Sequence, residues 1–237
     1  MESQVKAWDK KTNRAYYEAY DDRYRQVHGE SLRWFSEETS PIVREIFSEF
    51  HISSTHEILE IGCGEGRDAA FLLEQGFQVL ATDISQEAVN FCRRIYPEKA
   101  DNFQVLNCIT DSLEQKFDAI YAVAVVHMLV LDKDRDAFYR FIRHHLKPDG
   151  IALICTMGDG SFERQSDIST AFDLQERVHE ASGKILRIAG TSCRMVSFAT
   201  LEQELAKNGL DIIRQGMTSI EPDFPQTMYV VVKRCER

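Results

Sequence analysis

The sequence contains no long apolar run, no internal repeat and no low-complexity stretch. Its first residues, MESQVKAWDKKTNRAYYEAY, are polar and charged, so they predict neither a secretory signal nor a membrane span. Five prolines and twelve glycines among 237 residues exclude a fibrous or collagen-like chain. At 43% hydrophobic and 28% charged residues, the composition indicates a globular protein that buries a core without disulfide support.

The cysteine spacing and the balance of charges exclude further classes of protein. The six cysteines form no C-x-x-C pair, so the sequence predicts no zinc or redox motif, no metal site, and reduced thiols in a cytoplasmic protein. The chain has 28 Lys and Arg against 38 Asp and Glu, and its net charge of -10 argues against binding nucleic acid through the phosphates. This balance does not exclude a local basic groove.

Short apolar runs alternate with helical stretches through the middle of the chain. This alternation predicts an α/β fold with a mostly parallel central sheet. The expected strands are 56–62, 77–83, 103–108, 117–126 and 151–157. The expected helices are 67–75, 85–97 and one that begins at Asp132, followed by a turn at LKPDG (146–150).

The flanking segments differ from this core. The first 50 residues are expected to be helical, and Pro41 directly after Ser40 marks a helix start. Residues 158–195 interrupt the alternation, and insertions of this length usually form lids or binding elements. The chain is expected to close with a helix (198–209) and an antiparallel pair of strands (211–220 and 228–234). We therefore expect one domain over 1–237, with a helical N-terminal cap (1–50) and a covering insertion (158–195).

The most specific local pattern is a glycine-rich loop, Glu60-Ile61-Gly62-Cys63-Gly64-Glu65-Gly66-Arg67, between an expected strand and an expected helix. Alternate glycines let the backbone bend tightly and let a ligand approach it, and the helix N-terminus offers free N–H groups. The dinucleotide pattern G-x-G-x-x-G fits poorly, because Arg67 stands at its third glycine position. Asp83 ends the next expected strand, where a carboxylate accepts hydrogen bonds from two ribose hydroxyls.

The stretch ILEIGCGEGRDAAFLLEQGFQVLATDISQEAV (58–89) resembles the first two motifs of the class I S-adenosylmethionine-dependent methyltransferases. The G-C-G-x-G-R-D form is most similar to the small-molecule branch with thiopurine and tellurite-resistance-type enzymes. The resemblance covers 56–157 well. It implies a Rossmann-like, doubly wound, mostly parallel seven-stranded sheet with an antiparallel C-terminal strand, and S-adenosylmethionine as cofactor.

The resemblance also implies roles for single residues. The methionine end of the cofactor would meet Glu60, Gly62, Cys63, Gly64, Gly66 and Arg67. Asp83 would bind the ribose, Ile84 would flank the adenine, and Ala122 to His127 would lie beside the transferred methyl group. Family members often carry an acid after the third strand, but Cys108 stands there in this chain, with Asp111 three residues later. The adenine contact therefore stays open, with the backbone near Cys108 and Ile109 as the candidate.

His127 follows the fourth expected strand and is the candidate catalytic residue. Its imidazole has an ordinary pKa near neutrality, which suits a general base. The alternative is that His127 packs against the following helix. Methyl transfer needs no strong base when the acceptor lone pair is held in line with the methyl group.

Aromatic and basic residues of the flanking segments allow two interpretations each. Tyr16, Tyr20 and Tyr24 share a helix face at i, i+4 spacing, and with Trp34 they form either a lid that contacts the cofactor or a packing stripe. Arg23 either pairs with the cofactor carboxylate or is solvated. The insertion arginines either bind a carboxylate or phosphate of the acceptor or are surface charges; they are Arg164, Arg177, Arg187 and Arg194.

The sequence thus predicts an enzyme that transfers a methyl group to N, O or S of a small soluble molecule. A membrane or nucleic-acid partner is not expected, and the oligomeric state is not predicted. Three alternatives remain: an RNA or protein methyltransferase, a nicotinamide oxidoreductase, and a non-catalytic cofactor-binding module.

Overall fold

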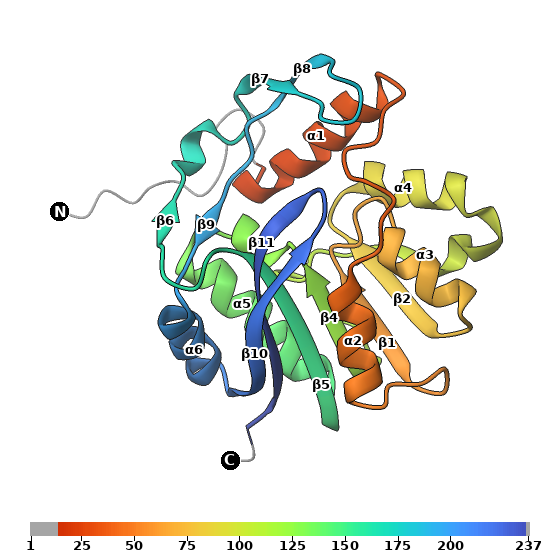
Figure 1. Ribbon diagram of the computed structural model, residues 1–237, viewed down its shortest axis with the longest axis vertical. Helices are drawn as coiled ribbons and strands as arrows, with labels where there is room; N and C mark the ends of the chain where they lie inside the picture. Colours follow the sequence, from red (N-terminus) through yellow and green to blue (C-terminus); the bar gives the residue numbers. More distant parts are fainter. Residues whose placement is uncertain (1–13, 236–237) are drawn as a thin grey trace.

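The computed structural model describes residues 14–235, and a seven-stranded sheet between two layers of helices forms its centre (Figure 1). Only β11 runs antiparallel to its neighbours, which confirms the predicted fold class. In spatial order the strands are β10 (Leu210–Ile220), β11 (Phe224–Arg234), β5 (Leu146–Met157), β4 (Phe117–Val123), β1 (Glu57–Ile61), β2 (Gln78–Asp83) and β3 (Phe103–Val105). Residues 1–13 of the predicted cap lie outside the described part of the chain.

Six α-helices lie in the described residues, and two of them begin at a serine that caps the first turn. Ser85 Oγ accepts the N–H of Ala88, and Ser197 Oγ accepts the N–H of Thr200. The helices are α1 (Ala19–His28), α2 (Pro41–Glu49), α3 (Arg67–Glu74), α4 (Gln86–Ile95), α5 (Asp132–His145) and α6 (Phe198–Lys207). Short 3₁₀ turns lie at Tyr16–Glu18, Pro97–Asn102, Val126–Met128 and Ile168–Thr170.

Period-two alternation along the strands divides the core between the two faces of the sheet. In β4, Ile120 and Ala122 pack on the face covered by α5 and α6. Ala119 and Tyr121 point the other way and pack with α2, α3 and α4. Both faces are buried, which is why the inner strands read as continuous apolar runs in the sequence.

The insertion folds into two small antiparallel ribbons: β6 (Arg164–Gln165) pairs with β9 (Arg194–Met195), and β7 (Leu174–Val178) pairs with β8 (Ile185–Ala189). The β7–β8 hairpin lies against α1 (Figure 1). Leu186 and Ile188 of β8 pack with Val27 of α1 in a small apolar cluster. α1 and the insertion therefore form one layer, whereas α2, which the predicted cap also included, packs on the sheet.

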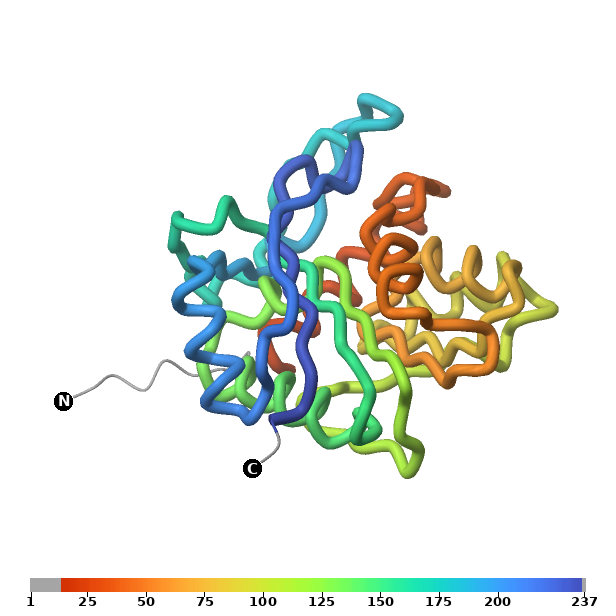
Figure 2. The backbone as a smooth tube through the Cα atoms, turned by 60° about the horizontal axis from the view of Figure 1, so that its bottom comes forward, coloured from red at the N-terminus to blue at the C-terminus, as the bar shows by residue number. Residues whose placement is uncertain are grey.

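Several expected boundaries are wrong. Residues 29–40 form no helix, because this segment runs over the glycine loop, where Glu65 accepts the N–H groups of Trp34 and Phe35. The expected turn at 146–150 lies inside β5, which absorbs it by a register shift between β4 and β5. β3 ends at Val105 and β4 at Val123, both earlier than predicted. The closing hairpin forms as predicted, and Figure 2 shows its tip beyond the end of the sheet.

Candidate active site

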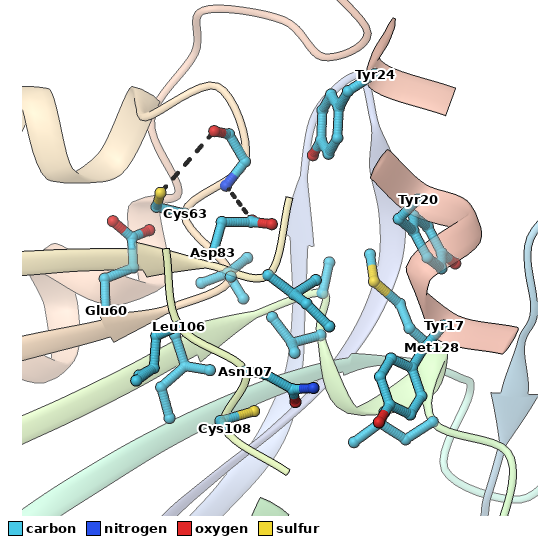
Figure 3. Close-up of a pocket in the computed structure, with 18 of the residues that line it drawn as sticks. Tyr17, Tyr20, Tyr24, Glu60, Cys63, Asp83, Leu106, Asn107, Cys108 and Met128 are labelled. Carbon is cyan, nitrogen blue, oxygen red and sulfur yellow. Dashed lines mark hydrogen bonds between the residues drawn. The ribbon is translucent and has the colours of Figure 1, made fainter. Parts of the chain in front are cut away.

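The main pocket lies at the carboxyl ends of β1, β2 and β4, beneath α1 (Figure 3). Ligands of open α/β sheets bind at this edge. About 920 Å³ of empty space lies within the pocket and its opening to solvent. Its wall is formed by the glycine loop, the segments after β2, β3 and β4, tyrosines of the cap, Phe35 and Phe224.

The glycine loop is anchored to the neighbouring strand and has no room for side chains at its first two glycines. The N–H groups of Gly62 and Cys63 both donate to the carbonyl oxygen of Thr82, at 2.7 and 2.9 Å. Gly62 and Gly64 have φ angles of 74° and 53°, which glycine adopts without strain. A Cβ atom on Gly62 would lie 2.3 Å from Val125, so the loop can bend closely around the pocket only with glycine there.

Asp83 is the most constrained acid in the pocket. It is 7% exposed, and its two carboxylate oxygens accept the N–H groups of Gly64 and Ser85, each at 2.8 Å. Each oxygen keeps one acceptor site, so the carboxylate can accept hydrogen bonds from two adjacent hydroxyls. Burial raises the pKa of Asp83 to about 6, although these two N–H groups oppose the rise.

Glu60 has an unfilled hydrogen-bonding position at the pocket wall. It is 3% exposed, and its Oε2 makes no hydrogen bond of good geometry among the described residues, although the Tyr121 hydroxyl, unpaired in the same sense, lies close enough to lower the pKa of Glu60. Burial, and then the nearby charge of Asp68, raise the pKa of Glu60 well above its ordinary value. Buried polar atoms are normally hydrogen-bonded, so this carboxyl group suits a ligand that carries an ammonium group.

The cap contributes Tyr17, Tyr20 and Tyr24 to the pocket wall, opposite Glu60 and Asp83 (Figure 3). Tyr17 was missed, although its i, i+3 spacing to Tyr20 is a signal that it shares their face. The hydroxyl of Tyr24 lies over the glycine loop, 2.7 Å from where a Cβ atom on Gly64 would stand.

Tyr16 takes no part in the pocket wall. Its hydroxyl donates to Asp134 at 3.0 Å and accepts the N–H groups of Val130 and Leu131. Of the two interpretations of the tyrosine stripe, packing describes Tyr16. Tyr20 and Tyr24 line the pocket, as a lid would require, and their contact with a cofactor stays a prediction.

Arg23 and Trp34 both lie behind the pocket. The guanidinium of Arg23 donates to the carbonyl oxygens of Ala189 and Gly190, both at 2.9 Å, and lies 4.8 Å from the Trp34 ring. Arg23 is therefore neither solvated nor directed at a ligand. It joins α1 to the backbone of the insertion.

The loop after β4 is held by donors from α5 and from the insertion. Arg135 donates to Val126 O at 2.8 Å and is itself paired with Glu204. Ser192 Oγ donates to Met128 O at 2.7 Å, and Arg194 donates to Val130 O at 2.9 Å. Met128 and Leu129 line the pocket, so these bonds fix one of its walls.

Eleven of the thirteen residues expected at the cofactor are in the pocket wall. They are Tyr20, Tyr24, Glu60, Gly62, Cys63, Gly64, Arg67, Asp83, Ile84, Cys108 and Ile109. Gly66 and Ala122 are not: Gly66 abuts Cys92 and Phe103, and Ala122 lies in the core beneath. The wall also contains residues that were not expected, Asn107, Phe35 and Phe224.

His127 is not a pocket-lining residue either. It is 4% exposed, and its Nδ1 has no partner among the described residues. Burial, and then the positive charge of Arg135, lower its pKa to about 3, so its imidazole is neutral at physiological pH. A group of such low basicity, outside the pocket wall, is poorly suited to remove a proton.

The insertion arginines do not line the pocket. Arg164, Arg177 and Arg187 are exposed, and Arg194 pairs with Asp132 and Glu204. Among residues 14–235, no group of His, Cys, Asp and Glu side chains is arranged to hold a metal ion. The same residues contain no helix with the length and apolarity that spanning a membrane requires.

Comparison with known proteins relates this geometry to one family. Residues 59–152 match a family model described as a methyltransferase domain. Ubiquinone biosynthesis O-methyltransferases of Rickettsia canadensis and Rickettsia prowazekii are 29% and 33% identical over 118 residues, which is 49% of this chain in both cases. The chain spans about half the length of these curated relatives, 49% and 46%.

Solved structures extend the likeness to the whole fold. The CcbJ methyltransferase from Streptomyces caelestis superposes with a TM-score of 0.68 at 16% identity, over 92% of this chain and 98% of that one. An S-adenosylmethionine-dependent methyltransferase from Clostridium acetobutylicum gives a TM-score of 0.64 at 15% identity, over 92% and 99%. Residues 59–152 are thus similar to a methyltransferase domain, and the chain shares its fold with these solved methyltransferases.

Proposed function

We propose that this protein is an S-adenosylmethionine-dependent methyltransferase that acts on N, O or S of a small molecule. The observation that carries the proposal is the pairing of Asp83 and Glu60 in one pocket. Asp83 offers two acceptor sites for a ribose, and Glu60 offers an unpartnered carboxyl for the ammonium group of an amino acid. S-adenosylmethionine has both groups, whereas a nicotinamide dinucleotide has no amino-acid end.

The protein's part in the reaction is mainly to bind and orient. Asp83 would hold the ribose hydroxyls, Glu60 and the glycine loop would hold the methionine end, and Ile84, Cys108 and Ile109 would flank the adenine. The bound cofactor supplies an activated methyl group on a positively charged sulfur. Holding an acceptor in line with that group accounts for most of the rate enhancement that this chemistry needs.

The cap covers part of the pocket. Tyr17, Tyr20 and Tyr24 place three aromatic rings across it, and the walls are mainly apolar. Mainly apolar surroundings strengthen the interactions of Asp83 and Glu60 with their ligand groups. The proposed mechanism uses no protein base at His127, and the acceptor proton passes to solvent.

The relatives bear on the atom that is methylated. The Rickettsia proteins are named O-methyltransferases of ubiquinone biosynthesis, and they match 118 residues of this chain. This similarity favours an oxygen acceptor on a small molecule, and the acceptor itself stays a proposal.

Isothermal titration with S-adenosylhomocysteine, adenosine and NADH tests the cofactor. We expect S-adenosylhomocysteine to bind more tightly than adenosine, because only the former reaches Glu60, and NADH to bind much more weakly than both. Tight binding of NADH without binding of S-adenosylhomocysteine would contradict the proposal. Binding of S-adenosylhomocysteine with no transfer of labelled methyl to any metabolite fraction would instead identify a non-catalytic binding module.

A further inference from the structure

The end of the pocket near β4 is separate from the ribose site. The strand order β4-β1-β2 puts two strand spacings between Asp83 and the end of β4, about 10 Å. Asp83, Ile84 and Cys108 lie at the β2 and β3 side of the pocket, whereas Ala124 and Val125 continue directly from β4. A nucleoside at Asp83 therefore leaves the β4 end for the second reactant.

Two aromatic rings form the wall at this end. Phe35 comes from the loop between α1 and α2, and Phe224 is the first residue of β11. Their ring centroids are 5.5 Å apart, with an interplanar angle of 41°. They pack in one apolar cluster with Val123, Ala124 and Ile220. We call Phe35 and Phe224 the phenylalanine pair.

The charged groups beside the phenylalanine pair are already partnered. Arg67 donates to Asp223 at 2.6 Å, and its guanidinium lies 5.8 Å from the Phe35 ring centroid. Asp223 also accepts from the N–H and hydroxyl of Ser36, and Asp68 accepts from both groups of Ser40. An anion placed here would lose its hydration without gaining a free cation, which is unfavourable.

The same contacts fix the position of the two rings. Arg67 at the start of α3, Ser36 in the α1–α2 loop and Asp223 in the β10–β11 turn bind one another. Phe35 and Phe224 are the chain neighbours of Ser36 and Asp223. The ion pair thus holds the rings and is not available to a ligand.

We infer that the phenylalanine pair is the acceptor subsite and that it selects an uncharged, planar aromatic molecule. The inference rests on the proposed function and adds the chemical class of its acceptor. Offset or edge-to-face contact with two rings favours a flat aromatic over an aliphatic ring. The exposed arginines of the insertion do not contribute to this subsite. The inference therefore differs from the carboxylate or phosphate acceptor that these arginines allowed in the sequence analysis.

The test uses three probes with the full-length protein saturated with S-adenosylhomocysteine: 4-hydroxybenzamide, 4-hydroxybenzoate and cyclohexanecarboxamide. Binding is measured by ligand-observed NMR titration. We expect the neutral aromatic amide to bind most tightly. Phe35→Leu and Phe224→Leu should each weaken it by about threefold or more, without changing the affinity for S-adenosylhomocysteine. Arg177→Gln is the matched control and should change neither.

The inference would be overturned if 4-hydroxybenzoate bound as tightly as 4-hydroxybenzamide or more tightly. Weaker binding of 4-hydroxybenzamide to the Arg177→Gln variant would overturn it as well. If S-adenosylhomocysteine binds and none of the probes does, the acceptor class is wrong and the proposed function stands. If S-adenosylhomocysteine itself does not bind, the proposed function fails. Should Phe224→Leu be unstable by thermal melting, Phe35→Leu gives the decisive result, because Phe35 lies in a loop outside the sheet.

Discussion

The hydroxyl of Tyr20 donates a 2.8 Å hydrogen bond to the carbonyl oxygen of Ser192, across 172 positions of sequence. The ring of Tyr20 lines the pocket, while its hydroxyl holds the backbone of the insertion. Ser192 in turn donates from its own hydroxyl to Met128 O in the loop after β4. A single chain of contacts thus connects α1, the insertion and the wall of the pocket.

Tyr20→Phe removes this hydrogen bond and keeps the ring. We expect the free energy of unfolding to fall by about 1 kcal/mol, with faster amide exchange over residues 189–192. Tyr24→Phe is the control, since no hydrogen bond to the Tyr24 hydroxyl is found among the described residues, and it should leave both quantities unchanged. Equal effects in the two variants would show that the Tyr20–Ser192 contact is not what joins the two segments.

Asp83→Ala removes both acceptor sites for a ribose. We expect the affinity for S-adenosylhomocysteine to fall by about 30-fold to 1000-fold, which corresponds to two lost hydrogen bonds to a charged group. Calorimetry measures the change. Asp101→Ala, at an exposed acid just before β3, serves as the control. Unchanged affinity in Asp83→Ala would refute the assignment of the ribose site.

The raised pKa of Asp83, about 6, predicts how ligand binding depends on pH. The ribose hydroxyls bind the carboxylate form, so the ligand lowers this pKa and its affinity falls when the pH drops below about 6. In that range the affinity falls by up to about tenfold per pH unit. Titrations between about pH 8 and pH 5 measure it. A flat profile would mean that Asp83 titrates below this range.

Glycines and acids in the 60–83 segment were predictable because their geometry is local. A strand, a tight turn and a helix start follow one another, and Asp83 reaches Gly64 across one strand pair. Phe35 and Phe224 could not be predicted in the same way. Their meeting depends on the path of an irregular loop and on the length of the terminal hairpin, and neither leaves a periodic pattern in the sequence.

For His127, the surroundings of the side chain were the part that could not be predicted. Its position after β4 was correct, but the sequence does not reveal that the side chain is buried and that its ring centroid lies 6.3 Å from that of Phe224. Arg23 was likewise expected to meet solvent or a ligand. Its true partners are backbone carbonyl groups of β8 and the following residue, which no side-chain pattern encodes.

His127→Leu tests the role of this side chain directly. We expect the rate of methyl transfer to stay within about twofold, because a neutral imidazole with a pKa of about 3 contributes little as a base. Stability should not fall much, since the substitution removes a buried atom without a partner. Transfer of labelled methyl to a metabolite extract and thermal melting are the measurements. A loss of tenfold or more, with normal melting and ligand affinity, would restore His127 as the general base.

The surroundings of His28 predict that the stability of the cap depends on pH. Its side chain is 5% exposed, and its two ring nitrogens lie 2.9 Å from Glu65 and from Glu87. Burial lowers its pKa, but the hydrogen bonds and charges of the two carboxylates outweigh burial and raise it above the ordinary 6.5. Because the pKa of His28 is higher in the folded than in the unfolded protein, the stabilisation is complete below about pH 6.5. It is lost as the pH rises through the pKa of the folded protein.

Amide exchange of α1 measures this effect. Corrected for intrinsic rates, protection of α1 should decrease between about pH 6 and pH 9 in the wild type and stay constant in His28→Gln. His51→Gln, at an exposed histidine, should behave as the wild type. Identical pH profiles for His28→Gln and the wild type would rule out the contribution of His28.

The layer formed by α1 and the β7–β8 hairpin has a kinetic consequence. Its Tyr20 and Tyr24 lie across the pocket, and hydrogen bonds from Arg23 and Tyr20 to the insertion hold α1 in place. We expect the reaction product to leave only as fast as this layer opens, so that turnover is limited by product release. An inhibitor of this protein would therefore gain residence time by stabilising the contact between α1 and β8, even without a new contact to Asp83 or Glu60.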